Sequence, residues 1–277
     1  MRIGDIEITP LSDGELRIPP EALLSKPAAE WPDGFLDADG LMGVNFGGFL
    51  VRTRDRLVVV DTGIGGGALP ELPIGTLPRR LAEAGVHVED VTDVIFTHLH
   101  FDHVGWATDG TRILFSYAEH HCHAIDWHHW CGADPVPETG PGREAFGAIP
   151  APQRLAPLAD RIHKHIGDGD IIPGIALRLA PGHSPGHCVV EIRSRGERAL
   201  LLADAAHNPA QLLSDDWTSA TDVNPELARA TRAALARELL DSGTLVTMTH
   251  DAGNRFGHLV TVNGNGERAW RYAPSIE

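Results

Sequence analysis

The sequence is poor in cysteine, in basic residues and in long apolar runs. Its only cysteines are Cys122, Cys131 and Cys188, an odd number with no CxxC spacing. This argues against a disulfide framework and favours a reducing, cytoplasmic setting. No segment approaches the roughly 20 apolar residues that a membrane helix needs. The N-terminal stretch carries acidic residues and no apolar core, so we expect no signal peptide.

Acidic residues outnumber basic residues in this sequence. The 277 residues include 23 lysines and arginines against 38 aspartates and glutamates, a formal charge of −15. Nucleic-acid backbones and anionic membranes are bound by clustered basic side chains, so we expect neither partner. With 42% apolar residues, 30 glycines and 20 prolines, the chain is typical of a loop-rich globular protein. A small-molecule substrate is the expected partner.

Short apolar runs recur, and most of them end in a polar residue. They predict strands buried on at least one face, which end at Asp61, His98, His183, Asp204 and His250. Helices are predicted over 76–86, 116–132 and 224–243, the last with Asn224 as N-cap and Gly243 as its stop. Strands interleaved with helices, without strict alternation, predict a layered α/β or α+β fold in one domain.

Histidine is abundant, with 16 residues, and is concentrated in "THLHFDHVGW" at 97–106. In an extended chain, residues two apart face the same side, so His98 and His100 can point one way as the strand ends. Asp102 and His103 follow in the turn, where they can be aimed at a second point. Imidazole and carboxylate are donors that Zn²⁺ accepts. The segment therefore predicts ligands for two neighbouring cations.

Each of these two centres needs further ligands. The strand-end residues His183, Asp204 and His250 are the obvious candidates, because the ends of adjacent strands meet in space. A carboxylate has two oxygens, so Asp204 could bridge two cations, which a histidine cannot do. The alternative is a set of unrelated surface side chains. Five separate occurrences at strand ends argue against it.

The motif "HLHFDH" at 98–103, with His183 in "PGHSPGH", Asp204 and His250, resembles the metallo-β-lactamase superfamily of αββα hydrolases. The resemblance runs from about "NFGGFLV" to "FGHLV". It implies a four-layer αββα sandwich, with residues 1–277 as a single domain whose arm at 1–45 and insert at 105–160 shape the pocket. One metal would be held by His98, His100 and His183, the other by Asp102, His103 and His250, with Asp204 as the bridge.

Within the superfamily the chain most resembles the lactonases and organophosphate hydrolases that are similar to methyl parathion hydrolase. The features are Asp rather than Cys at position 204, the long insert between His103 and His183, and "THDAGNRFGHLV" near the end. Three residues after the bridging aspartate, the better-known quorum-sensing lactonases carry tyrosine. The chain has His207 there, as the methyl parathion hydrolase type does.

The chemistry expected of such a site is hydrolysis. Two divalent cations roughly 3.5–4 Å apart lower the pKa of a shared water towards neutrality, and hydroxide then attacks a carbonyl or phosphoryl centre. Asp102 or Asp204 could carry the proton to the leaving group, and His207 could bond the substrate or an oxyanion. We expect zinc, with manganese, iron or cobalt also acceptable. The substrate would be a neutral or mildly anionic lactone or ester, and family analogy suggests a homodimer.

Several alternatives remain open at this point. The same ligands could serve a phosphotriester or phosphodiester hydrolase, a di-iron redox centre of the kind that normally has a flavin partner domain, or a non-catalytic metal-binding protein. The glycines of "GIGGGA" at 63–68 match a dinucleotide-binding pattern. The prolines of the following "LPELPIG" would break the helix which that motif requires.

Other residues have secondary roles. Asp61 is expected to orient a ligand histidine, and His258 to support the pocket. We expect His187 in a strand rather than on metal, and Cys188 as core filler. The histidines of the 116–132 helix are expected mostly at the pocket rim or in solvent: His120, His121, His123, His128 and His129. Aromatic side chains there could line the pocket or the core (Tyr117, Trp127, Trp130), and the Pro/Gly-rich loop 132–142 could lie over the site.

Overall fold

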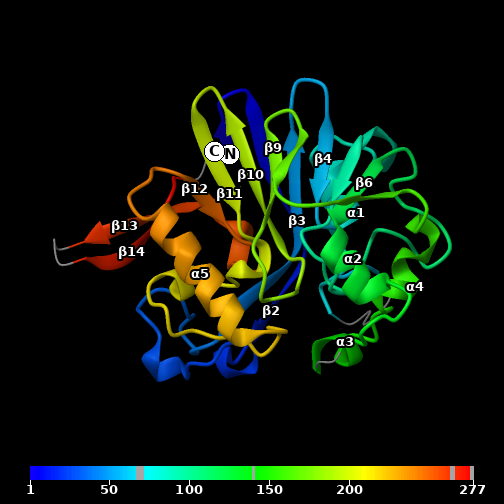
Figure 1. Cartoon of the computed structure of the whole chain (residues 1–277). Coiled ribbons are helices and arrows are strands. Elements are labelled where there is room, and N and C mark those ends of the chain that lie inside the picture. The colour runs from blue at the N-terminus through cyan, green and yellow to red at the C-terminus, as the bar shows by residue number, and fades with distance from the viewer. Residues whose placement is uncertain (67–71, 139–140, 263–265, 275–277) are drawn as a thin grey trace.

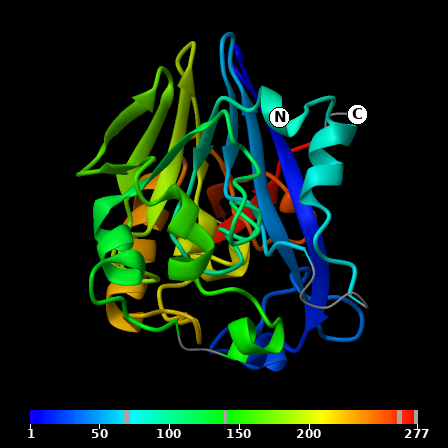
Figure 2. The same cartoon turned by 90° about the vertical axis from the view of Figure 1, so that its right-hand side faces the viewer.

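The computed structural model of the chain describes residues 1–66, 72–138, 141–262 and 266–274. Its centre is a pair of seven-stranded sheets (Figures 1 and 2). The first sheet contains, in spatial order, β1 (Arg2–Ile3), β2 (Ile6–Ile18), β3 (Met42–Arg52), β4 (Leu57–Val60), β5 (Asp93–Ile95), β6 (Glu119–His123) and β7 (Ile162–His165). The second contains, also in spatial order, β8 (Gly169–Ile172), β9 (Ile175–Leu179), β10 (Cys188–Ser194), β11 (Glu197–Leu201), β12 (Leu245–Thr247), β13 (Gly257–Val262) and β14 (Glu267–Tyr272).

Helices cover the outer faces of the two sheets (Figure 1). The α-helices are α1 (Leu77–Glu83), α2 (Ala124–Cys131), α3 (Pro141–Ala145), α4 (Ala151–Leu155) and α5 (Pro225–Leu239). Single 3-10 turns lie at Pro20–Ala22, Ala28–Glu30, Val88–Asp90, Ala156–Leu158, Ala203–Ala205, Pro209–Leu212 and Ala252–Asn254. No helix in the described ranges combines the length and apolar character needed to cross a bilayer.

Strand alternation divides the core into layers. In β4, Val58 and Val60 pack against the second sheet, whereas Val59 packs on the side of α1, α2 and α4. A third apolar cluster lies between the second sheet and α5, where Leu200 meets Leu235. The order is therefore helix, sheet, sheet, helix, and the expected αββα sandwich is confirmed.

Two of the three predicted helices form close to the expected bounds. The helix expected over 76–86 is α1, and the one expected from Asn224 is α5. The Asn224 side chain caps α5 by accepting a hydrogen bond from the Leu227 N–H at 3.1 Å. The helix ends at Leu239, before Gly243, which adopts a positive φ of 73°.

The third helix prediction, over 116–132, is wrong in its first half. Residues 119–123 form β6, which pairs in parallel with β5 and with β7. Cys122 and the ring of His120 face the core, the latter 6.2 Å from the Phe96 ring. The alternation typical of a strand is hard to see in this sequence, because histidine counts as a polar residue although the histidines of β6 are buried. The expected rim position is also wrong for His120, His121 and His123, all of which are buried.

Candidate metal centre

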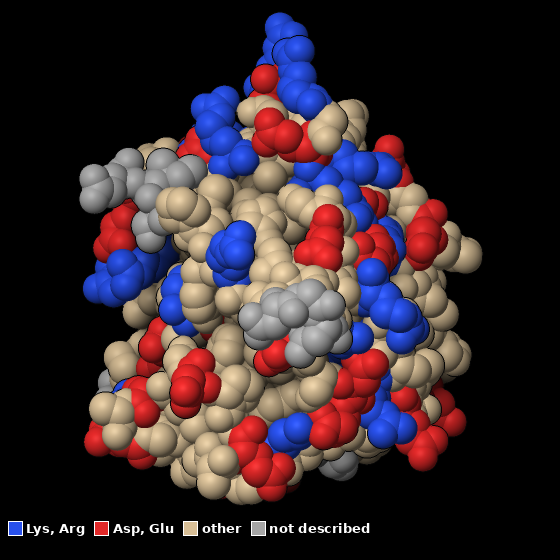
Figure 3. All heavy atoms as spheres, turned by 90° about the vertical axis from the view of Figure 1, so that its left-hand side faces the viewer, with Lys and Arg blue, Asp and Glu red and all other residues tan. Residues whose placement is uncertain are grey.

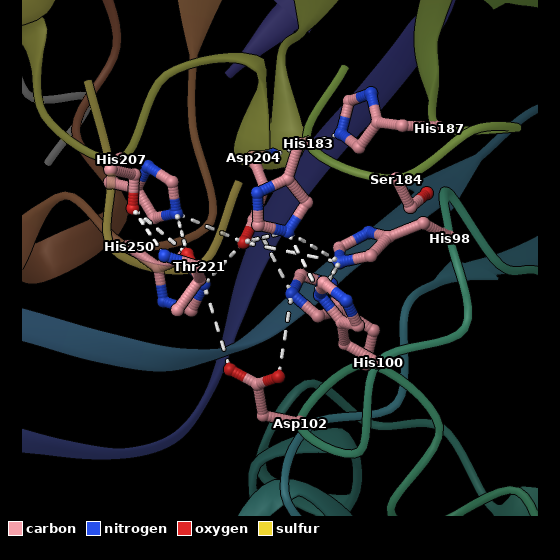
Figure 4. A network of polar contacts seen from close by, with 12 residues as sticks. His98, His100, Asp102, His183, Ser184, His187, Asp204, His207, Thr221 and His250 are labelled. Atoms are coloured by element: carbon pink, nitrogen blue, oxygen red, sulfur yellow. Dashed lines mark hydrogen bonds and ion pairs between the residues drawn. The ribbon is translucent and has the colours of Figure 1, made fainter. Parts of the chain in front are cut away.

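The residues expected at the strand ends lie at one edge of the sandwich. β4 and β5 are parallel, so the chain leaves both at the same end, towards Asp61 and His98. β11 and β12 are also parallel and lead towards Asp204 and His250. His183 follows β9 in the second sheet. Figure 4 shows the side chains of His98, His183 and His250 pointing into one volume, with Asp204 near its centre.

The first group of donors is made of three histidines. His98 Nε2 lies 3.1 Å from His100 Nδ1 and 3.2 Å from His183 Nε2, and the last two atoms are 2.9 Å apart. All three side chains are buried. Three ring nitrogens so close to one another match the donor set of a single cation.

The second group joins Asp102, His103 and His250. The Asp102 carboxylate lies 3.9 Å from His103 Nε2 and 3.7 Å from His250 Nε2. Asp204 stands between the groups: its Oδ1 is 3.3 Å from His103 Nε2, and its Oδ2 is 3.2 Å from both His250 Nε2 and His183 Nε2. One buried carboxylate thus faces both sets of donors.

Unpartnered atoms test whether cations fit here. His103 Nε2 and Asp204 Oδ1 are fully buried, yet neither makes a hydrogen bond of acceptable geometry. Leaving buried polar atoms without a partner costs several kcal/mol. Cations between the two groups would satisfy these atoms, so the donor set fits two divalent metals.

The charge state of His98, His100 and Asp204 suits metal binding. Burial lowers the pKa of His98 and of His100 well below the ordinary value, which leaves their lone pairs free. Burial would raise the pKa of Asp204, but His250, His103 and the other imidazoles hold it well below its usual range. The same carboxylate, with Asp61 and Asp102, overcomes desolvation at His103 and raises the pKa of that imidazole.

The outer ring nitrogens are held by neighbouring acceptors. Asp61 Oδ2 lies 2.9 Å from His103 Nδ1, which is the orienting contact expected from the sequence. His250 Nδ1 donates to the Asn45 carbonyl at 2.8 Å. Asp222 Oδ1 lies 3.2 Å from His183 Nδ1, a contact that the sequence analysis missed. Such outer partners fix the orientation and basicity of ligand histidines.

Asp222 offers a test of this outer shell. The Asp222→Asn protein should bind metal about 10–100-fold more weakly than the native protein, because His183 loses its charged acceptor while the side-chain shape is kept. Competition against a zinc-sensitive dye measures this affinity. Asp216→Asn, which alters an exposed carboxylate of the same loop, is the matched control. Equal affinities in both variants would contradict the role of Asp222.

Asp126 was also missed, and it ties two ligand loops together. Its fully buried carboxylate accepts hydrogen bonds from the Leu99 N–H and the Gly186 N–H, each at 2.8 Å, and from the Ser184 hydroxyl. One acceptor therefore links the segment of His98 and His100 to the loop of His183. No local pattern pointed to it, because its partners lie 27 to 60 residues away.

His207 lies beside the centre. Its Nε2 is 3.3 Å from Asp204 Oδ2 and 3.4 Å from the Thr221 hydroxyl, and its ring stacks on His250 at 5.4 Å. His187 lies immediately before β10, and its Nε2 accepts the Asp204 backbone N–H at 3.1 Å. This hydrogen bond helps to hold the backbone of Asp204 in place.

The remaining candidates divide clearly. Cys188 is buried in the core between the sheets. His258 bonds the Thr244 carbonyl at 2.9 Å, at the start of β12 and so at the far end of that strand from His250. The expected support of the pocket by His258 is therefore wrong. His128 is exposed and His129 is half-buried.

Aromatic side chains approach both donor groups. The Trp130 ring lies 5.0 Å from His100, and the Phe46 ring lies 5.8 Å from His250. Phe146 packs on Phe46 at 5.5 Å and on Phe101 at 6.0 Å. Tyr117, in contrast, is 76% exposed.

The dinucleotide alternative receives no support from the glycine turn. Gly67 and Ala68 of the motif lie outside the described residues. The N–H groups of Ile64 and Gly65 donate to Asp13 Oδ2 at 2.9 and 3.0 Å. They are therefore already used within the protein.

Comparison with known proteins agrees with this geometry. Residues 48–250 match the family model described as the metallo-beta-lactamase superfamily. An N-acyl homoserine lactonase of Bacillus cereus is 27% identical over 225 residues, which cover 73% of this chain and 80% of the relative.

Solved structures show the same fold. AidC, described as a dizinc quorum-quenching lactonase in complex with a product, has a TM-score of 0.83 at 23% identity, over 100% of this chain and 97% of its own. The hydrolase AbOPH has the same TM-score and coverage at 22% identity. A family match over most of the chain and a shared αββα architecture show that this chain belongs to the metallo-beta-lactamase superfamily.

Proposed function

We propose that this metal-dependent hydrolase opens a lactone ring, or cleaves a similar ester. The observation that carries the proposal is the convergence of six other potential metal donors around the buried Asp204 carboxylate. The Bacillus cereus lactonase, similar over most of its length, supports a lactone as the substrate. A small molecule is also what the lactonase AidC holds in its product complex.

Two divalent cations are the cofactors of this proposal. His98, His100 and His183 would hold one cation, and Asp102, His103 and His250 the other, with Asp204 shared between them. When bound, such cations act as Lewis acids and lower the pKa of water to about 7. We propose zinc, because the nitrogen and oxygen donors suit it and because AidC is described as dizinc. Manganese, iron and cobalt are accepted by similar donors.

The protein's own groups would handle the proton and the substrate. Asp102 is the most open carboxylate of the centre, with a side chain 13% exposed. It can therefore pass a proton to a leaving alkoxide, as can Asp204. His207 and Thr221 form a polar pair beside Asp204 and can donate hydrogen bonds to a substrate oxygen.

The surroundings favour a substrate of low charge. Phe46, Phe101 and Phe146 bring apolar surface to the edge of the centre. Burial, together with the charge of Asp102, raises the pKa of Glu138 to about 7. A substrate with more than one negative charge would be repelled by the carboxyl groups of Asp102 and Glu138. A neutral or mildly anionic molecule fits best.

The remaining features of the proposal concern the whole chain. We treat 1–277 as one domain in which 1–45 and 105–160 shape the pocket, since Asn45, Trp130 and Phe146 approach the centre from these segments.

Basic and acidic side chains are intermingled on the face in Figure 3, which does not suit a nucleic-acid partner. The cysteines are free, as a cytoplasmic location would require. A homodimer is the proposed assembly.

A second candidate function is phosphotriester hydrolysis, which His207 favours because this residue stands beside Asp204 where better-known lactonases have tyrosine. Zinc-loaded protein should be assayed with an acyl-homoserine lactone, p-nitrophenyl acetate and a neutral phosphotriester. We expect the highest kcat/KM for the lactone. A higher value for the phosphotriester would establish the second candidate instead. Absence of turnover with all three, in protein that holds two metals, would support a non-catalytic or redox role.

A further inference from the structure

A second cluster of histidines lies away from the metal centre, on β5, β6 and β7. Residues two apart in a strand share a face, which places Glu119 and His121 together in β6, and His163 and His165 together in β7. The two strands are parallel and adjacent, with His121 opposite His163. Asp93 of β5 lies on the same side, next to His121. None of these residues takes part in the proposed catalytic centre.

The nitrogens of this cluster are aimed at each other. His121 Nδ1 lies 3.0 Å from His165 Nε2, and its other nitrogen, Nε2, lies 3.3 Å from Asp93 Oδ1. Because Asp93 is an acceptor, it fixes the proton on Nε2 and leaves the lone pair of Nδ1 pointing at His165. This is the carboxylate–histidine arrangement that orients metal ligands in proteins.

The spacing of the two nitrogens suits a cation. Two imidazoles bound to one tetrahedral Zn²⁺ at about 2.0–2.1 Å place their nitrogens about 3.3 Å apart. In the catalytic centre, the corresponding separations among His98, His100 and His183 are 2.9 to 3.2 Å. Burial and the neighbouring imidazoles lower the pKa of His165, so its ring is neutral at neutral pH and free to bind.

The cluster is also accessible. His121 and Asp93 form a buried base, with side chains 9% and 3% exposed, whereas the side chains of His163 and Glu119 are 55% and 60% exposed. His163 stacks on His121 at 5.3 Å, and its Nε2 bonds Glu119 at 2.7 Å. An ion could thus enter from solvent and keep water molecules as its remaining ligands.

We propose that His121 Nδ1 and His165 Nε2 form a third, exchangeable site for a divalent transition metal such as Zn²⁺, Ni²⁺ or Cu²⁺. Imidazole is a preferred donor for all three ions. A cation there would join β6 to β7, which is the last strand of the first sheet in the described residues. Its binding would therefore stabilise the folded chain in proportion to metal concentration.

The test is a calorimetric titration with Zn²⁺ of protein whose catalytic centre is already filled and whose excess zinc has been dialysed away. We expect one further equivalent, weaker than the first two, and a rise in Tm as it binds. His165→Ala and His121→Ala should each lose this equivalent and the rise in Tm. His128→Ala, which removes an exposed histidine of α2, is the matched control and should keep both.

Measuring hydrolysis distinguishes a failure of this proposal from a failure of the proposed function. The His165→Ala protein should keep native kcat and KM, because the cluster shares no residue with the catalytic centre, and this also verifies folding. The proposal is overturned if the filled native protein takes up no further zinc. It is equally overturned if the extra equivalent persists in both His165→Ala and His121→Ala.

Discussion

The Asp204→Ala protein is expected to lose hydrolysis and bound metal together. Asp204 is the carboxylate that faces both donor groups, and it holds the negative charge around which His103, His183 and His250 are arranged. Without Asp204, two buried cations would lose one of the carboxylates that balance their charge. Charges buried without such compensation are strongly unfavourable. We expect kcat/KM to fall by at least about 10³-fold, which corresponds to about 4 kcal/mol of transition-state stabilisation.

Elemental analysis and steady-state kinetics on the same preparation check this result. Asp134→Ala, in which an exposed aspartate is removed, should keep two metals and full activity. Circular dichroism establishes whether the Asp204→Ala chain is folded. Native rates in a folded Asp204→Ala protein would remove the basis of the proposed centre.

Removal of the metals is expected to lower the Tm by about 10 °C. Ligands that bind only the folded state stabilise it by RT ln(1 + [L]/Kd), or about 4 kcal/mol at 1,000 times Kd. In a chain of this size, each kcal/mol moves Tm by about 2–4 °C. The physical cause is that unpartnered buried atoms such as His103 Nε2 and Asp204 Oδ1 are left without a cation.

Scanning calorimetry before and after chelation measures the shift, and added zinc should restore the native Tm. The Asp204→Ala protein serves as the control, since its Tm should barely respond to chelation. A native protein whose Tm is the same with and without chelator would contradict the prediction.

The metal-depleted protein should also acquire a dependence on pH. Nearby carboxylates raise the pKa of His103 in the folded chain, so a proton on this ring stabilises the fold. That contribution is complete below the unfolded pKa of about 6.5. It is lost as pH rises through the raised folded value. The Tm of depleted protein should therefore fall further from pH 6 to alkaline pH than that of the metal-loaded protein.

The metal donors could be predicted from sequence because their signal is local. His98, His183, Asp204 and His250 each follow a short apolar run, and four of the proposed donors lie within the six residues 98–103. Asp61 could be predicted for the same reason, since it ends a strand that is parallel to the one before His98. Recognition of the superfamily added the pairing of these residues into two groups.

The supporting residues carry no such signal. Asp222 lies 39 residues from His183 in sequence, and Asp126 lies 58 residues from Ser184. Both are joined to these partners only by tertiary packing. The sequence predicts a helix at β6 because histidine counts as a polar residue, which hides the alternation of the strand. The chain instead uses His123 as the N-cap of α2, with its ring accepting the Ile125 N–H.

The division of the donors between the two sheets has a consequence for folding experiments. Residues 98–103 follow a strand of the first sheet, whereas His183, Asp204 and His250 follow strands of the second. Neither half of the sandwich can complete a coordination sphere alone. The visible absorption of Co²⁺, added during renaturation from urea, would therefore develop only when the halves dock. The rate at which this absorption appears would thus measure the rate at which the two sheets pack together, without any need for a substrate.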